Sequence, residues 1–222
     1  PYESADLAAF ARGLDVVSYE FENVPVTVAR ALEGHVSVRP GPRALELLQD
    51  RVIEKDFMRD LGVPVPGYRA VGSLAELRRA QDELGLPLVL KTRRLGYDGK
   101  GQALLREGGE LEPAWEALGA VPLIAEQFVA FRREVSLVCV RGLQGETVFY
   151  PLVENHHPGG ILGMTLAPAP QLTPGLQLHA EQIGARVLEA LDYVGVLTLE
   201  FFDTGESEAP LLVNELAPRV HN

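Results

Sequence analysis

The first forty residues alternate between short apolar runs and one amphipathic stretch. Residues 15–19 (DVVSY) form an apolar run that predicts a buried strand, and residues 24–33 have the spacing of a helix. Residues 36–39 predict a second short strand. Strand–helix–strand alternation is typical of a parallel sheet. We therefore expect residues 1–42 to belong to a parallel α/β domain.

The next stretch, residues 43–61, predicts one amphipathic helix. Apolar side chains recur at helical spacing, as at Ile53, Phe57 and Leu61, and we expect this stripe to face a core. Gly62 then provides the C-terminal stop that many helices have. The pattern predicts a single helix between the N-terminal strands and the rest of the chain.

A Pro- and Gly-rich linker at residues 64–67 precedes a group of short elements. Residues 73–84 predict a helix in which Ser73 is the N-cap and Glu76 completes a capping box. Strands are predicted at residues 88–92, 102–106 and 121–129. The glycine-rich loop between the first two of these strands predicts a hairpin, and therefore antiparallel pairing.

The C-terminal half predicts a second group of strands with one helix. Thr173 is expected to cap this helix, Pro174 to occupy its first turn, and an apolar stripe to run along it to residue 191. Four strands are predicted in this half, at residues 134–140, 147–153, 194–203 and 211–216.

The composition of the chain excludes several classes of function. Of the 222 residues, 46% are hydrophobic, which allows a substantial core. The chain has 20 basic and 31 acidic side chains and a formal charge of −11, so it repels phosphodiester backbones and we expect no nucleic-acid partner. No stretch approaches the roughly 18 apolar residues of a membrane helix, so we expect no membrane partner.

Cys139 is the only cysteine, so an intrachain disulfide cannot form, and this fits a cytoplasmic location. It lies in an apolar run, which is typical of a buried, inert thiol. The sequence begins at Pro1 without a methionine and stops at Asn222 without a closing helix. We expect further segments of the protein beyond both ends.

Lys91 and the glycine-rich residues 96–102 (GYDGKGQ) are the first candidates for chemistry. A lysine at the end of a strand can meet a phosphate, and glycines let consecutive backbone amides form an anion nest to which Lys100 adds charge. Asp98-Gly99 is equally a favoured hairpin turn. The P-loop pattern G-x-x-x-x-G-K-[ST] is absent. The loop alone leaves both interpretations open.

Glu200 and Glu215 are the second candidates. Glu200 lies inside an apolar run, where a carboxylate is costly. If the last two strands form a hairpin that turns near Ser207, the two glutamates lie opposite each other, and like charges in that position destabilise a sheet. A divalent cation would remove this penalty, and Mg²⁺ commonly takes one or two carboxylates. Paired glutamates on an exposed face are the alternative, which the neighbouring leucines and valines disfavour.

Two further groups are compatible with nucleotide binding. The segment Glu126-Gln127-Phe128-Val129 can offer backbone groups to an adenine edge, and the carboxylates of Glu126 and Glu134 can accept ribose hydroxyls. Solvated glutamates are the alternative there. His156 and His157 can include one phosphate-facing histidine or be polar loop residues, since sequence neighbours rarely bind one ion together.

The order of these groups resembles that of ATP-grasp ligases: a lysine strand, a glycine-rich hairpin, an E-Q hinge, a second glutamate and two metal glutamates. Within that superfamily the chain is similar to the N5-carboxyaminoimidazole ribonucleotide synthetase family. The segments that carry the resemblance are residues 19–24 (YEFENV), 91–94 (KTRR), 96–102, 134–136 (EVS) and 214–222 (NELAPRVHN). The last of these segments is the most specific.

The resemblance implies a role for each matching residue. Contacts with ATP are implied for Arg51, Lys91, Gly96, Tyr97, Asp98, Gly99, Lys100, Gly101, Gln102, Glu126, Gln127, Phe128, Val129, Glu134, His157, Asn214 and Glu215. Ligation of Mg²⁺ is implied for Glu200 and Glu215. The region that receives bicarbonate and aminoimidazole ribonucleotide is implied for Tyr97, Asp98, Arg219, His221 and Asn222, with Glu20 as a further substrate contact.

The resemblance also implies a fold of the α/β class and an activity. A small antiparallel lid lobe at about residues 67–131 and a large lobe at residues 132–222 would form the ATP-grasp domain, residues 43–222. Residues 1–42 would be the remnant of a substrate-binding α/β domain. The implied activity is the ATP- and bicarbonate-dependent carboxylation of 5-aminoimidazole ribonucleotide in purine biosynthesis, through carboxyphosphate, by a cytoplasmic homodimer.

Three alternatives stay open. A sister ligase, such as formate-dependent glycinamide ribonucleotide transformylase or biotin carboxylase, differs in the loop at residues 96–102 and in the final motif. A nucleotide-binding module without catalysis would have no need of Lys91, Glu200 and Glu215 together. A generic acidic α/β binding domain would have no ATP affinity. The family's glycine-rich first strand–turn–helix and its basic C-terminal segment are not among these residues, so we expect this piece alone not to turn over substrate.

Overall fold

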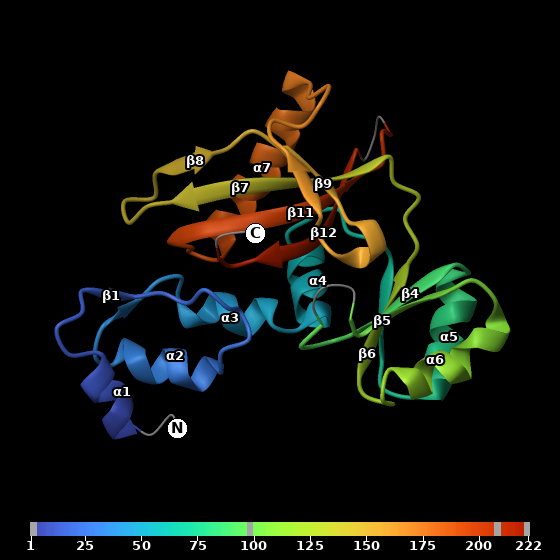
Figure 1. Ribbon diagram of the computed structural model, residues 1–222, viewed down its shortest axis with the longest axis horizontal. Helices are drawn as coiled ribbons and strands as arrows, with labels where there is room; N and C mark the ends of the chain where they lie inside the picture. The colour runs from blue at the N-terminus through green and yellow to red at the C-terminus, as the bar shows by residue number, and fades with distance from the viewer. Residues whose placement is uncertain (1–3, 97–99, 207–209, 220–222) are drawn as a thin grey trace.

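The computed structural model describes residues 4–96, 100–206 and 210–219, and its secondary structure forms three bodies (Figure 1). Each body has its own cluster of buried apolar side chains. The N-terminal body lies at the lower left of the view, the small lobe at the lower right and the large lobe at the top. Helix α4 (Arg51–Asp60) stands where the three bodies meet.

The N-terminal body has the predicted strand–helix–strand order. Its elements are α1 (Ser4–Phe10), β1 (Val16–Val17), α2 (Val26–Glu33) and β2 (Ser37–Val38). The two strands pair in parallel, which confirms the prediction of a parallel sheet. Leu32 and Val38 are buried in its core together with Leu45 from the following helix.

The predicted single helix over residues 43–61 is wrong: two helices, α3 (Pro42–Leu48) and α4, replace it. Asp50 separates them. Its backbone is extended and its side chain accepts a hydrogen bond from the amide of Val52 at 3.1 Å, which makes Asp50 the N-cap of α4. Aspartate is among the strongest N-cap residues, and this local bond competes with helix continuation.

The buried face of α4 also differs from the predicted apolar stripe. Ile53 and Phe57 are only partly buried, whereas Glu54, Lys55 and Met58 are at most 2% exposed. The charged residues can be buried because they meet partners on strands far away in the sequence, which a local apolar pattern cannot reveal.

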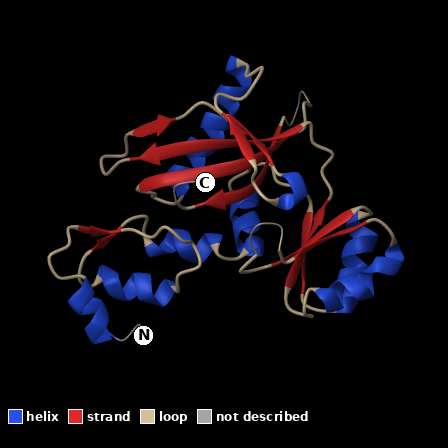
Figure 2. Cartoon of the chain, in the orientation of Figure 1, coloured by secondary structure: helices blue, strands red, loops and turns tan. Residues whose placement is uncertain are grey.

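The small lobe is an antiparallel sheet covered by helices on one face (Figure 2). The strand order is β3-β6-β4-β5, which confirms the predicted antiparallel lobe. Its elements are β3 (Tyr68–Val71), α5 (Leu74–Leu84), β4 (Leu88–Thr92), β5 (Gln102–Leu105), the short 3₁₀ helix η1 (Gly108–Glu110), α6 (Leu111–Ala117) and β6 (Leu123–Gln127). The sequence pattern predicted neither β3 nor α6.

The N-terminus of α5 departs from the predicted capping box. The hydroxyl of Ser73 accepts from the amide of Glu76 at 3.3 Å, as an N-cap does. The Glu76 carboxylate, however, accepts from the amide of Gly72 at 2.6 Å and not from that of Ser73. The reciprocal bond is therefore shifted by one residue, and only the N-cap half of the prediction is confirmed.

The large lobe is a six-stranded sheet with helix α7 (Pro174–Ala190) against one face (Figure 1). Its strand order is β10-β9-β7-β11-β12, and β8 also pairs with β7. The strands are β7 (Arg133–Arg141), β8 (Thr147–Phe149), β9 (Val153–His156), β10 (Met164–Leu166), β11 (Gly195–Asp203) and β12 (Leu211–Ala217), and the 3₁₀ helix η2 (Pro158–Gly160) precedes β10. Thr173 caps α7 through the amide of Leu176, as predicted.

The predicted strand over residues 147–153 is two strands in the structure. Strand β8 pairs with the C-terminal part of β7, and β9 pairs with its N-terminal part. Pro151 lies between them and has no amide hydrogen to donate to a ladder, so the strand cannot continue through this position.

Gly184 lets α7 lie close to β7, and this close approach can be tested. A Cβ atom at Gly184 would lie 3.0 Å from Leu137 Cδ2 and 3.3 Å from Phe149 Cε1, whereas one at Gly175 would meet nothing within 4 Å. Alanine favours a helix over glycine by up to about 1 kcal/mol, and overpacking costs about 1–3 kcal/mol. We expect Gly175→Ala to raise the free energy of unfolding slightly and Gly184→Ala to lower it, with a difference of about 1–2 kcal/mol in urea unfolding. Equal stability of the two variants would contradict the packing of α7 on β7.

Candidate active site

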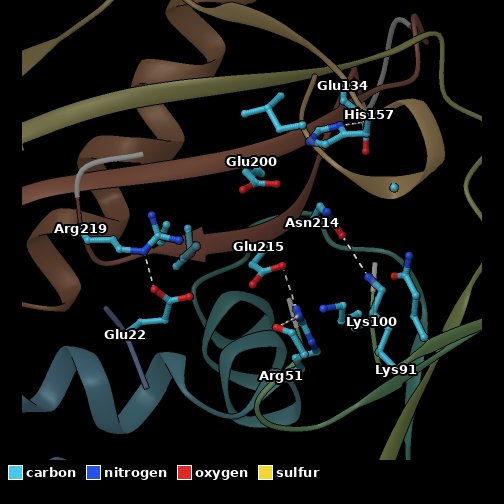
Figure 3. Close-up of a pocket in the computed structure, with 17 residues that line it drawn as sticks. Glu22, Arg51, Lys91, Lys100, Glu134, His157, Glu200, Asn214, Glu215 and Arg219 are labelled. Carbon is cyan, nitrogen blue, oxygen red and sulfur yellow. Dashed lines mark hydrogen bonds and ion pairs between the residues drawn. The ribbon is translucent and has the colours of Figure 1, made fainter. Parts of the chain in front are cut away.

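A pocket of about 250 Å³ lies where the large sheet, the start of α4 and the small lobe meet (Figure 3). Most of the described residues that line it were predicted as site residues: Arg51, Lys91, Gly96, Lys100, Gly101, Gln102, Glu134, His157, Glu200, Asn214, Glu215 and Arg219. Others line it without having been assigned a role: Glu22, Gly160, Leu162, Leu216 and Ala217. The predicted residues Tyr97, Asp98, Gly99, His221 and Asn222 lie outside the described part of the chain.

Arg51, the first residue of α4, connects Glu215 with the glycine-rich segment. Its guanidinium lies 2.9 Å from Glu215 Oε2 and also donates to the carbonyl of Gly96 at 3.4 Å. Burial disfavours both charges, but the pKa of Arg51 is nevertheless raised by Glu215 and the pKa of Glu215 is lowered by Arg51. Both groups are therefore ionised, and Glu215 presents a carboxylate to the pocket.

Lys91 is the next to last residue of β4 and is held by two acceptors. Its Nζ donates to Glu126 Oε2 at 2.7 Å and to Asn214 Oδ1 at 3.2 Å. Glu126 is 3% exposed and has a second cation, Lys55, at 3.8 Å. Burial alone would raise the pKa of Glu126, but the charges of Lys55 and Lys91 lower it to about 2. The ionised Glu126 therefore fixes the ammonium group of Lys91 at the edge of the pocket.

The segment Glu126-Gln127-Phe128-Val129 is placed differently from the expectation. The Glu126 side chain is buried and paired with Lys91, so the alternative of a solvated glutamate is wrong for this residue. The amides of Gln127 and Phe128 donate to the carbonyls of Gly67 at 2.7 Å and Pro87 at 3.2 Å. Among the described residues, this segment does not line the pocket.

Glu200 and Glu215 lie opposite each other on neighbouring strands, as predicted. They are register partners in the antiparallel pair of β11 and β12, and Figure 3 shows both side chains in the same pocket. The expected turn near Ser207 lies outside the described residues. The arrangement concentrates negative charge at one wall, opposite Arg51 and Lys91.

Glu134 and His157 form a second polar wall. Glu134 is on β7 and His157 follows β9, which pairs with β7 at this end. His157 Nδ1 lies 2.6 Å from Glu134 Oε2. The neighbouring His156 instead meets Glu154, with Nε2 3.0 Å from its carboxylate. The two adjacent histidines therefore have different partners, and His157 is the one that lines the pocket.

Arg219 and Glu22 form an ion pair that joins the end of the large sheet to the N-terminal body. Substrate contact was predicted for Glu20, but Glu20 is exposed, and Glu22 is the residue of this segment that lines the pocket. The sequence signal for Glu22 was the segment of residues 19–24, which matches the family and contains both glutamates.

Asp50 was missed as a residue that organises the site. Besides capping α4, its carboxylate accepts from Arg93 through Nε at 3.0 Å and Nη2 at 2.8 Å, and from Arg94 at 3.2 Å. Burial acts to raise the pKa of Asp50, but Arg93, the Val52 amide and Arg94 together lower it. The start of α4 is thus tied to the residues that follow Lys91.

Within the described residues, no group of three or more His, Cys, Asp or Glu side chains is placed to hold a metal ion by itself. No helix in that part of the chain is long and apolar enough to cross a membrane.

Antiparallel sheets in two lobes thus flank a charged pocket, and comparisons with known proteins identify the class of fold. The model of the ATP-grasp domain family matches residues 56–222, and that of the ribonucleotide synthetase preATP-grasp domain matches residues 2–49. The chain belongs to the ATP-grasp family.

Among individual proteins, the chain is similar to N5-carboxyaminoimidazole ribonucleotide synthase. It is 48% identical over 216 residues to the enzyme of that name from Pseudomonas aeruginosa, a match that covers 97% of this chain and 58% of the relative. The crystal structure of N5-carboxyaminoimidazole ribonucleotide synthetase from Thermus thermophilus has a TM-score of 0.91 at 53% identity, over 99% of this chain and 58% of that one.

A third similar protein was crystallised with ligands. The N5-carboxyaminoimidazole synthase from Aspergillus clavatus, in complex with ADP and 5-aminoimidazole ribonucleotide, has a TM-score of 0.88 at 26% identity, over 99% of this chain and 57% of that one. The chain thus spans little more than half the length of these relatives. The predicted family and fold are confirmed by these comparisons.

The charge of Asp50 can be separated from its capping role with Asp50→Asn, because asparagine caps a helix about as well. We expect the variant to lose about 1–2 kcal/mol at pH 7, since its pairs with half-exposed arginines are partly screened. A carboxylate with a lowered pKa stabilises the fold above its ordinary pKa, and this stability is lost as pH falls through the lowered value. In urea unfolding, the difference in the free energy of unfolding between variant and wild type should therefore disappear as the pH falls below about 4.

Asp60→Asn on the exposed end of the same helix is the matched control and should change little at either pH. A loss for Asp50→Asn that is the same at pH 7 and pH 3 would contradict the role of the charge.

Proposed function

We propose that the chain is part of an ATP-dependent carbon–nitrogen ligase that carboxylates 5-aminoimidazole ribonucleotide to N5-carboxyaminoimidazole ribonucleotide. The observation that carries this proposal is the opposition of Glu200 and Glu215 in one pocket with Lys91 and Arg51. Opposed carboxylates facing fixed cations suit a nucleotide with a bound metal ion. The named relatives, which have this activity in their names, support the choice of substrate.

The pocket fits Mg²⁺ in its donor chemistry. Glu200 and Glu215 supply hard carboxylate oxygens, and Mg²⁺ is usually bound by one or two carboxylates together with substrate phosphates and water. The scarcity of further protein ligands among the described residues agrees with such a shared site. When bound, the ion would neutralise charge on the phosphates.

For ATP we propose contacts by Arg51, Lys91 and the segment Gly96–Gln102, with Glu134 and His157 toward the nucleoside. Phosphoryl transfer requires charge neutralisation and positioning more than covalent help. Lys91 is suited to this because Glu126 and Asn214 fix its ammonium group. The backbone of residues 126–129 stays our proposed adenine hinge, and Tyr97, Asp98 and Gly99 stay further proposed contacts.

The proposed reaction has two steps. A bicarbonate oxygen attacks the γ-phosphorus of ATP, ADP leaves, and carboxyphosphate forms. The exocyclic amine of 5-aminoimidazole ribonucleotide then attacks the carboxyl carbon of carboxyphosphate, and phosphate leaves. In the other route, carboxyphosphate first splits into CO₂ and phosphate, and the amine attacks the CO₂. Because carboxyphosphate hydrolyses readily, a closed site that excludes water favours transfer. Arg219 is suited to hold the anion, since its guanidinium can meet two oxygens.

We also propose Glu20, Glu22, His221 and Asn222 on the substrate side, a second copy of the chain as the partner in a homodimer, and a cytoplasmic location. The preATP-grasp match over residues 2–49 supports a substrate role for the N-terminal body. Residues 1–42 and 43–222 remain our proposed domain division.

The proposal is tested with a full-length version of the protein. ATP hydrolysis is measured with and without bicarbonate, and carbamate formation with and without 5-aminoimidazole ribonucleotide. We expect hydrolysis to require bicarbonate and carbamate to require both substrates. Hydrolysis that depends on formate, or nucleotide binding without turnover, would instead identify a sister ligase or a non-catalytic module.

Glu215 is expected to be essential for turnover. Glu215→Gln keeps the size of the side chain but removes the charge that faces Glu200 and Arg51, so ATP turnover of the full-length enzyme should fall at least about 100-fold. Circular dichroism should show an intact fold. Glu181→Gln, which lies outside this pocket on α7, is the matched control. Near-normal turnover of Glu215→Gln would remove the metal assignment.

Arg219 is expected to matter for carbamate formation more than for nucleotide affinity. Lysine keeps the charge but cannot reproduce the bidentate geometry of arginine. Arg219→Lys should leave ATP affinity nearly unchanged and lower carbamate production by about 10- to 100-fold, which corresponds to about 1.4–2.7 kcal/mol of transition-state stabilisation. Lost ATP affinity at an unchanged yield of carbamate per ATP would place Arg219 on the nucleotide side.

A further inference from the structure

The alternation of buried and exposed residues along strand β12 is interrupted between Asn214 and Glu215. Leu211 and Val213 are buried in the core of the large lobe, so strict alternation would also turn Glu215 into that core. Instead Leu216 is buried, and Asn214 and Glu215 are both partly exposed. Asn214 and Glu215, two neighbours in one strand, therefore both line the pocket, as do Leu216 and Ala217 after them.

The register of the strand pair gives the reason for this interruption. Glu200 lies opposite Glu215, but the next residue of β11, Phe201, lies opposite Val213. Asn214 is thus an extra residue on β12 without a register partner on β11, which is a β-bulge. A bulge of this kind re-aims side chains and weakens the ladder locally.

Two adjacent residues of α4 hold the backbone on both sides of this bulge. Lys55 donates from Nζ to the carbonyl of Asn214 at 2.7 Å and to that of Val213 at 3.2 Å. Glu54 accepts from the amide of Leu216 at 2.5 Å. Both side chains are 2% exposed. Side chains of α4 therefore hydrogen-bond to the backbone of β12 immediately before and after Glu215.

We propose that Glu54 and Lys55 are positioning residues that fix the bulge at Asn214, so that Asn214 and Glu215 face the pocket together. Asn214 then reaches Lys91, and Glu215 reaches Arg51 and faces Glu200, as Figure 3 shows. For its catalytic consequence this inference rests on the proposed function.

Stability of the fold alone does not explain why Glu54 and Lys55 occupy these buried positions. A buried charged or polar group commonly stabilises a fold no more than an apolar residue of similar volume does. The contacts of Glu54 and Lys55 are instead made with the backbone of β12 where it departs from the regular ladder. Groups that orient metal ligands typically change metal affinity by about 10- to 100-fold when they are replaced.

The central experiment compares Glu54→Gln with Glu54→Met in the full-length enzyme. Glutamine keeps an acceptor for the Leu216 amide, whereas methionine has a similar volume and no such acceptor. Without any ligand, hydrogen exchange at Leu216 should be much faster in Glu54→Met and nearly unchanged in Glu54→Gln. Mg²⁺ is then titrated in two assays, ADP binding by calorimetry and ATP turnover. In both, the Mg²⁺ concentration at half-maximal effect should rise about 10- to 100-fold in Glu54→Met only.

Lys55→Met is the second arm and should raise the Mg²⁺ requirement in the same way through the Asn214 carbonyl. Arg59→Met, at an exposed position of the same helix, is the control and should behave as wild type. If the two methionine variants do not fold, Glu54→Asp, whose carboxylate is withdrawn by one methylene, replaces them with a smaller expected increase.

Three outcomes would overturn the proposal. One is a wild-type Mg²⁺ requirement in a folded variant that has lost Leu216 protection. Another is unchanged Leu216 exchange in Glu54→Met. The third is an equal loss in Glu54→Gln and Glu54→Met, since charge and not the hydrogen bond would then matter. Failure of the proposed function is distinguishable, because wild type would then lack bicarbonate-dependent ATP hydrolysis while the exchange experiment still tests the bulge.

Discussion

The ammonium group of Lys55 is buried at the junction of the three bodies, and its burial would cost several kcal/mol without acceptors. Those acceptors are the carbonyls of Val213 and Asn214 on the large sheet and the carboxylate of Glu126 on the small one. The charge of Lys55 is therefore satisfied only when α4 is docked against both lobes. This condition couples the formation of the two lobes to each other.

The pocket depends on the same junction because its groups come from different bodies. Glu126 links Lys55 to Lys91, and thereby extends the buried network from α4 to the edge of the site. The N-terminal body is joined through Gln49, whose amide donates to the carbonyls of Glu22 and Val24 at 2.8 and 2.6 Å. A displacement of any one body would separate cations from carboxylates, so the geometry of the site reports on the packing of the whole chain.

The local pattern of apolar, capping and turn residues was sufficient to predict those elements that depend mainly on residues close in the sequence. Strand β4 has the predicted bounds, α7 begins at its predicted cap, and the opposition of Glu200 and Glu215 followed from the length of a hairpin. The break at Asp50 was missed because a continuous apolar stripe outweighed one capping residue. Strand β3 was missed because only one of its four residues is fully buried.

The burial of Glu54 and Lys55 could not be predicted locally, because their partners lie about 160 residues further along the chain. The bulge they contact, however, leaves a trace in the sequence. In the run Leu211-Leu212-Val213-Asn214-Glu215-Leu216, a period of two assigns Glu215 to the apolar face and Leu216 to the polar one. The extra residue at Asn214 reverses both assignments, so that Glu215 leaves the apolar face and Leu216 joins it. A charged residue that falls on the apolar face, with an apolar residue directly after it, is therefore a sign of a bulge. Here the sign coincides with a carboxylate that has to leave the core to meet Glu200 and Arg51, so the irregularity in the strand and the chemistry of the site have the same cause.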